Sequence, residues 1–86
     1  MNPTEVKSTF NRNHNTEEQT TTGTLGTVPY MVVKRTDFAE PDRTGGRQYT
    51  VRHSIYIRND ENQWVAASEQ RSREALIAFG FIRDQD

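Results

Sequence analysis

Residues 49–58 read YTVRHSIYIR, and this stretch decides the fold. Its even positions are mostly polar or charged, and its odd positions are Tyr49, Val51, His53, Ile55 and Ile57. Successive side chains of a strand point to opposite faces, so this alternation predicts a strand with one buried face and one face in water. The face in water would carry Arg52, Tyr56 and Arg58.

Two further strands are expected beside this one. Residues 28–35 are short, apolar and β-branched, which favours a strand, and Pro29 suits a strand start or a sheet edge. Both faces of that strand are apolar, which leaves open whether Tyr30 or Met31 faces inward. Residues 59–63 have the composition of a turn, and residues 64–67 predict a short third strand that pairs back as a hairpin.

A helix is predicted after the third strand. Ser68 is a plausible N-cap, and Gly80 stands where a left-handed C-cap belongs. Between them an apolar stripe faces the sheet, and residues 81 and 82 can fold back onto the same core. The stripe consists of Ala75, Leu76, Ile77 and Phe79. The predicted fold is therefore α+β, with a three-stranded antiparallel sheet and a C-terminal helix packed on one face, in the order β-β-β-α.

The first 27 residues differ in character from the rest. Their asparagines and threonines cannot bury enough apolar surface to offset the entropy of ordering the backbone, so residues 1–27 are expected to form a flexible polar arm. Residues 28–86 would form the folded domain. Within the arm, Asn2 could cap a short helix with Val6 and Phe10 on one face, which would form only by docking.

Composition argues against several classes of protein. The chain has 86 residues, no cysteine and a net charge of −1, so disulfides and thiolate metal sites are excluded and net charge does not steer it toward nucleic acid or membrane. No apolar run could span a membrane. We therefore expect a cytoplasmic protein that is not an enzyme, binds no cofactor and has no membrane partner.

No metal site is expected either. Asp37, Glu40 and Asp42 lie in one loop and could offer oxygen ligands, but their spacing matches no EF-hand and Pro41 interrupts them. Of the two histidines, His14 falls in the arm and His53 on the inferred buried face, where a place at the rim of the core is expected.

The candidate site is the face of residues 49–58 that is in water. Residues 43–59 contain four arginines and no acid, and arginine and tyrosine concentrate binding energy at protein interfaces. The candidate partner-binding residues are Arg43, Arg47, Arg52, Tyr56, Arg58, Val6 and Phe10. We expect a non-catalytic protein that modulates or inhibits a protein partner. The alternative is an ordinary solvated face whose arginines pair with neighbouring acids.

A second alternative comes from residues 70–76, which read QRSREAL. A short first helix, three strands and a last helix that opens with basic residues is similar to a double-stranded-RNA-binding domain. The resemblance implies a small RNA- or DNA-binding module that uses Arg52, Arg58, Arg71 and Arg73.

A folded part of this size is close to the lower limit for independent stability, and a homodimer would relieve that.

Overall fold

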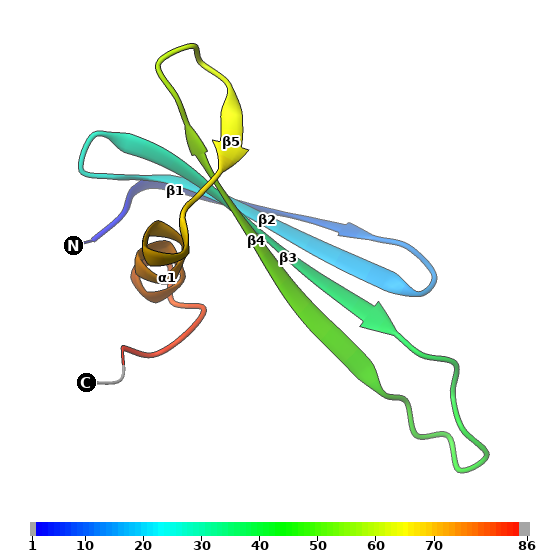
Figure 1. Cartoon of the computed structure of the whole chain (residues 1–86). Helices are drawn as coiled ribbons and strands as arrows, with labels where there is room; N and C mark the ends of the chain where they lie inside the picture. The colour runs from blue at the N-terminus through cyan, green and yellow to red at the C-terminus, as the bar shows by residue number, and fades with distance from the viewer. Residues whose placement is uncertain (1, 85–86) are drawn as a thin grey trace.

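The computed structural model describes residues 2–84, which form one antiparallel sheet and one helix (Figure 1). The strands follow one another in chain order, from β1 at one edge to β5 at the other. The elements are β1 Thr4–Arg12, β2 Thr16–Leu25, β3 Val28–Phe38, β4 Tyr49–Arg58, β5 Trp64–Ala66 and α1 Glu69–Ala78. The predicted α+β class, the antiparallel sheet and the C-terminal helix are confirmed, but the sheet has five strands and not three.

The two additional strands lie in the stretch that was expected to be a flexible arm. β1 pairs with β2, and β2 pairs with β3 along its whole length. The expected short helix with Val6 and Phe10 is wrong, since both residues belong to β1. The physical reason is that threonine is β-branched, so a polar tract of threonines fits the pleated surface of a sheet once a neighbouring strand supplies the hydrogen bonds.

A two-residue turn joins the additional strands to the rest of the sheet. Leu25 and Val28 are cross-strand partners, which leaves only Gly26 and Thr27 between them. Gly26 has a φ of 63°, in the left-handed region that tight hairpin turns require. This turn sets the register that brings Thr21 beside Val32 and Gly23 beside Tyr30.

The core lies between the sheet and α1. Its buried side chains are Tyr30, Val32, Ile55 and Ala75. Val32 and Ile55 are cross-strand partners, and Val32 has no exposed surface. Tyr30 therefore faces the helix, and Met31 points to the opposite side of the sheet. Around this centre pack partly buried apolar residues, including Leu25, Val28, Ile57, Leu76, Phe79 and Phe81.

Both predicted ends of the helix are confirmed. The Ser68 hydroxyl accepts a hydrogen bond from the Arg71 backbone N–H at 3.3 Å. At the other end Gly80 has a φ of 84°, and the Phe81 N–H donates to the Leu76 carbonyl at 2.8 Å. This reversal turns Phe81 back onto the core, whereas Ile82 stays exposed.

The helix covers only part of the sheet. The expected burial of Tyr49 and Val51 is wrong, because they are 64% and 39% exposed. Both lie beyond the reach of a ten-residue helix, in the part of the β3–β4 ribbon that extends away from the core (Figure 1). The molecule measures 50 × 33 × 21 Å, and its radius of gyration is 15.0 Å. A compact chain of this length has a radius of gyration of about 12 Å.

Removal of residues 1–24 should abolish cooperative unfolding. The deletion strips β3 of its neighbour on one side and removes Thr21, which is buried. The backbone groups of β3 that bond to β2 would lose their partners. Thermal melting followed by circular dichroism measures the result, and a sharp transition in the truncated chain would show that β1 and β2 do not belong to the folding unit.

Gly23→Val should destabilise the protein by about 1–3 kcal/mol, because the site has no room for a side chain. A Cβ at residue 23 would lie 2.6 Å from Cε1 of Phe79, which packs against the core. Urea unfolding measures the loss. The matched control is Thr22→Val on the opposite side of β2, which keeps a β-branched side chain and should unfold close to the natural protein.

Candidate interaction surface

The sheet has one face without a covering element among residues 2–84. The helix packs on the side of Val32 and Ile55, so the alternate residues of each strand point to the other side, which we call the open face. Strand register places eleven residues near its centre. These are Glu18, Thr20, Thr22, Met31, Val33, Arg35, Arg52, Ser54, Tyr56, Arg58 and Trp64.

The predicted two-sidedness of β4 is confirmed around Ile55. Ile55 is buried with the helix, whereas Arg52 and Arg58 are exposed and Tyr56 is half-buried on the open face. Tyr56 stands in one cross-strand row with Met31 and Ala66. Its position within three paired strands holds the ring on a rigid platform, which lowers the entropy lost when a partner binds.

An arginine pair gives the open face its main electrostatic feature. Arg35 and Arg52 are direct cross-strand partners, and like charges directly opposite each other destabilise a sheet. Arg35 is partly neutralised, because its Nε donates to Asp37 Oδ1 at 3.0 Å and Glu18 is its cross-strand partner on β2. Arg52 has no acidic partner among the described residues. A carboxylate supplied from outside would therefore relieve repulsion as well as form a new ion pair.

A second cationic position adjoins an indole ring. The guanidinium of Arg58 lies 5.4 Å from the centre of the Trp64 ring, within the range of a cation–π interaction. Trp64 is itself exposed and is the cross-strand partner of Arg58. The stacking keeps the guanidinium over the sheet with its N–H groups available, because none of the ion pairs among residues 2–84 uses Arg58.

Sequence reasoning missed Arg35 and Trp64 as members of this surface. Their strands are either apolar on both sides or too short to show alternation. The register with β4 was the missing information: Arg35 aligns with Arg52, and Trp64 with Arg58. Once that register is known, the alternation of β4 assigns both residues, since any residue aligned with an even position of β4 must share its face.

The remaining predicted partner-binding residues do not lie on the open face. Phe10 is the cross-strand partner of Gln19, which shares the helix side with Thr21, and Val6 lines a hollow with Phe79 and Phe81 on that side. Arg47 is engaged within the chain. Its Nε donates to the Ala39 carbonyl at 2.7 Å, and its guanidinium stacks over the Phe38 ring. Arg43 is exposed at the tip of the β3–β4 connection.

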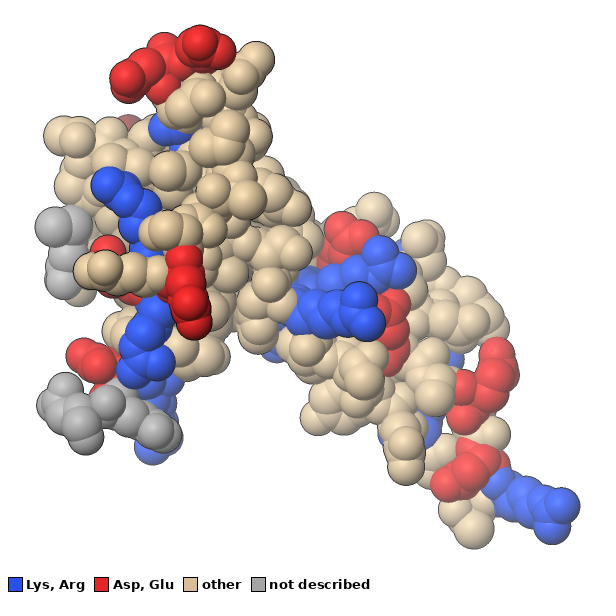
Figure 2. Space-filling view, in the orientation of Figure 1, with Lys and Arg blue, Asp and Glu red and all other residues tan. Residues whose placement is uncertain are grey.

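The four arginines of the nucleic-acid alternative are also divided. Arg52 and Arg58 point to the open face, whereas Arg71 and Arg73 belong to α1 on the other side of the sheet. The expected first helix is a strand, so the topology of the double-stranded-RNA-binding domain is not present. Figure 2 shows charges of both signs scattered over the visible side, with no field of one sign.

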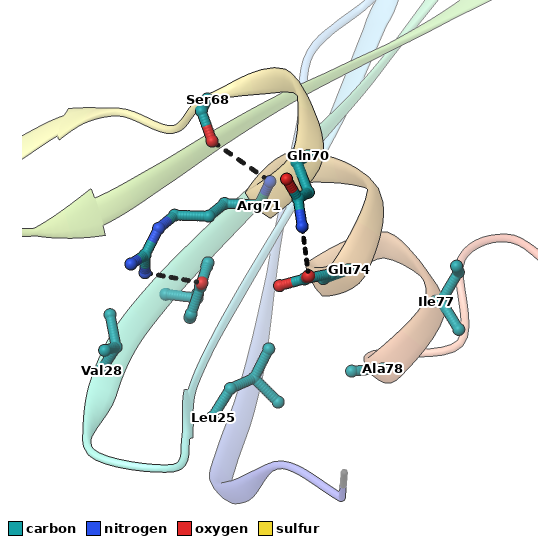
Figure 3. A pocket seen from close by; sticks show the side chains of 9 residues that line it. Leu25, Val28, Ser68, Gln70, Arg71, Glu74, Ile77 and Ala78 are labelled. Atoms are coloured by element: carbon teal, nitrogen blue, oxygen red, sulfur yellow. Dashed lines mark hydrogen bonds between the residues drawn. The ribbon is translucent and has the colours of Figure 1, made fainter.

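A pocket lies between α1 and the β2–β3 turn (Figure 3). Leu25 and Val28 line it from the sheet, while Arg71, Glu74 and Ile77 line it from the helix. Arg71 Nη1 donates to the Tyr30 hydroxyl at 3.4 Å, and Glu74 accepts from Gln70. The pocket's arginine therefore helps to hold the helix on the sheet.

The acidic loop has a structural role in the described chain. Asp42 Oδ1 accepts hydrogen bonds from the Thr44 hydroxyl at 2.8 Å and from the N–H groups of Thr44 and Gly46. These bonds, with that from the Thr44 hydroxyl the strongest contributor, lower the pKa of the Asp42 carboxyl below its usual value. Asp37 belongs to β3 and not to the loop, which corrects the expectation that the three acids lie in one loop, and its carboxylate accepts a hydrogen bond from Arg35. Among the described residues, no three acids or histidines form a cation-binding group.

His53 lies at the rim of the core, as predicted. Its ring meets the Phe81 ring edge-on, with 5.6 Å between the ring centres. Burial lowers the pKa of His53 below its ordinary value of 6.5, and the positive charge of the cross-strand neighbour Lys34 lowers it further. The imidazole thus favours its neutral form in the folded chain.

Comparison with protein-family models, with curated proteins and with solved structures gives no match to this chain. The helix found in residues 2–84 is too short to cross a membrane. The chemistry of the open face is therefore the basis for a functional conclusion.

Stability should fall as the pH drops below about 6.5. The pKa of His53 is lower in the folded chain than in the unfolded chain, so the unfolded chain binds more protons between these two pKa values. The contribution of His53 to the free energy of unfolding is therefore present above pH 6.5 and is lost as the pH falls through the folded pKa. Urea unfolding at neutral and mildly acidic pH measures this dependence. It should shrink in His53→Gln and persist in His14→Gln; an equal dependence in all three proteins would contradict the role of His53.

Proposed function

We propose that this chain is a non-catalytic binding protein that modulates or inhibits a protein partner by covering an acidic surface of that partner with its open face. The observation that carries the proposal is the opposition of Arg35 and Arg52 on that face. Arg35 has Glu18 opposite it on β2 and Asp37 beside it, whereas Arg52 forms no ion pair in the described chain. A partner carboxylate converts this repulsion into attraction, and arginine grips carboxylates with two parallel hydrogen bonds.

Aromatic and apolar groups supply the rest of the binding energy. Tyr56, Trp64 and Met31 are neighbours on the open face, and residues of these types are enriched in the cores of protein interfaces. Arg58, which stacks on Trp64, adds a cation at the end of the open face where β5 pairs with β4. The threonines of β2 extend the platform with short side chains that lose little entropy when they are covered.

The cysteine-free composition supports a reducing compartment, and we propose the cytoplasm as the site of action. That the chain is not an enzyme remains a prediction made from the sequence.

The proposal is tested by comparing two double variants in capture experiments from lysate. Arg52→Ala/Arg58→Ala removes the two cations that β4 places on the open face, and Arg73→Ala/Arg83→Ala removes two exposed cations from α1 and the segment after it. Each charged hydrogen bond lost costs about 1.5–3 kcal/mol, so the first variant should bind its partner at least tenfold more weakly. The second should bind as the natural chain does, and both should melt cooperatively.

Nuclease treatment and salt separate a protein partner from nucleic acid. A protein held by aromatic residues and a few ion pairs should survive nuclease and moderate salt. Nucleic acid would be lost with nuclease and would weaken steeply with salt through counterion release. Capture that is insensitive to the open-face variant would overturn the proposed surface, and capture that requires nucleic acid would replace the partner class.

A further inference from the structure

One stretch of β4 has an edge that no strand covers in the described chain. β5 pairs only with residues 56–58 of β4, and the last bond of this ladder runs from the Ala67 N–H to the Ile55 carbonyl at 3.0 Å. Backbone groups point to alternate sides along an antiparallel strand, so the odd residues of β4 point toward the β5 side. Beyond Ile55, these outward-pointing residues are Tyr49, Val51 and His53.

We infer that this edge pairs with the same edge of a second copy of the chain, in antiparallel register about a two-fold axis at Val51. The numbers of any two residues that lie opposite each other in the two copies then add up to 102. Val51 faces its own copy, Tyr49 faces His53, and Thr50 faces Arg52. The outward-pointing backbone groups of the three odd residues meet in both copies, which satisfies N–H and C=O groups that otherwise bond only to water.

The neighbouring register that is shifted toward β5 is poorer for two physical reasons. A shift that places residues summing to 104 opposite each other brings Arg52 onto its own copy, and like charges directly opposite are destabilising. The same shift sets Tyr49 against Ile55, whose outward carbonyl is already taken by Ala67. The register about Val51 avoids both problems and ends where β5 begins.

The side chains at this edge suit an interface. Tyr49 and Val51 are exposed on the helix side, and Tyr49 of one copy would arrive beside His53 and Phe81 of the other. The edge from residue 49 to residue 54 holds no proline or positive-φ residue, and Arg52, its only formal charge, points to the open face.

The other edge of the sheet is less suited to pairing. β1 has an irregular register between Thr4 and Lys7, and Glu5 has a φ of 55°. Bulges and charged side chains are features by which proteins protect edge strands from association. A dimer in which two open faces stack on each other is a different arrangement. It is disfavoured because it would bring Arg35, Arg52 and Arg58 of the two copies close together.

The chain exposes more surface than a compact monomer of its mass, so surface is available for a second copy. The chain exposes 6696 Å² at a mass of 10.0 kDa. A folded monomer of this mass exposes about 5,200 Å², so the excess is roughly 1,500 Å². A typical interface covers about 800 Å² on each partner, which leaves room for an edge-to-edge dimer in addition to a partner on the open face.

Cysteine cross-linking of the full chain tests the register directly, because the natural sequence has no cysteine. Across the axis the Val51 Cα atoms would lie about 5.5 Å apart, within disulfide range. The Arg52 Cα atoms would lie roughly 8 Å apart, beyond that range. Under mild oxidation Val51→Cys should therefore form a covalent dimer readily and Arg52→Cys should not; the reverse result would overturn the proposed pairing.

Sedimentation measurements on the full chain test the edge itself. The natural chain should sediment as a dimer, and Val51→Asp, which sets two carboxylates against each other, should raise the dissociation constant roughly tenfold or more. Val51→Pro should act similarly, since it removes an outward N–H without touching the bonds to β3. Phe10→Pro makes the equivalent change on β1 and should leave the dimer intact.

Two outcomes would refute the dimer whatever partner the open face binds. One is a natural chain that stays monomeric at every concentration tested. The other is a dimer that Phe10→Pro disrupts and Val51→Asp does not. If Val51→Pro fails to fold, as judged by circular dichroism, Val51→Asp and the cross-linking pair still decide the result, because residue 51 is exposed in the monomer.

Discussion

The packing of α1 against Val32 and Ile55 is the constraint on which the rest of the structure depends. A ten-residue helix is not stable alone in water. It exists here because Ala75 is buried against the sheet and Leu76 and Phe79 are partly buried beside it. The same contact fixes the two faces of the sheet. A slip of one residue in β4 would place Arg52 and Tyr56 beneath the helix and expose Ile55, so burial of one apolar pair selects the register of the strands around it.

This arrangement separates the buried apolar core from the face that we propose for recognition. One face carries nearly all the buried apolar surface, and the other carries arginines, a tyrosine and a tryptophan on strands that are already paired. The opposition of Arg35 and Arg52 is costly for the isolated chain. Asp37 and Glu18 offset part of this cost. In the function that we propose, the remainder favours an acidic partner surface, because a neutral surface would leave the repulsion in place.

The parts of the fold that sequence predicts are those with strong local signals. β4 alternates without ambiguity over ten residues, and Ser68 and Gly80 mark the two ends of the helix. The strands β1 and β2 lack such a signal. Their threonines and asparagines resemble those of a disordered segment, and they become strands because pairing with β3 supplies hydrogen bonds from residues distant in the sequence.

The candidate site shows the same division. Arg52, Tyr56 and Arg58 could be assigned to one face from the alternation of a single strand, and the structure places them together. Arg35 and Trp64 could be added only with the register of neighbouring strands. The spacing of Val6 and Phe10 predicts a helix, and the side of the sheet on which they lie depends on the pairing of β1 with β2, which the sequence does not reveal. Long-range pairing, and not residue chemistry, limited the prediction.

The loop at the far end of the β3–β4 ribbon has a consequence for how this chain can change. Asp42 ties Thr44 and Gly46 into a closed set of hydrogen bonds, at a distance from the helix and the buried side chains. These bonds are made within the loop and none of the buried side chains belongs to it, so a change in the loop should leave the core unaltered. A peptide label inserted at Arg43 would break the bonds of Asp42 but should leave the packing of the helix on the sheet in place.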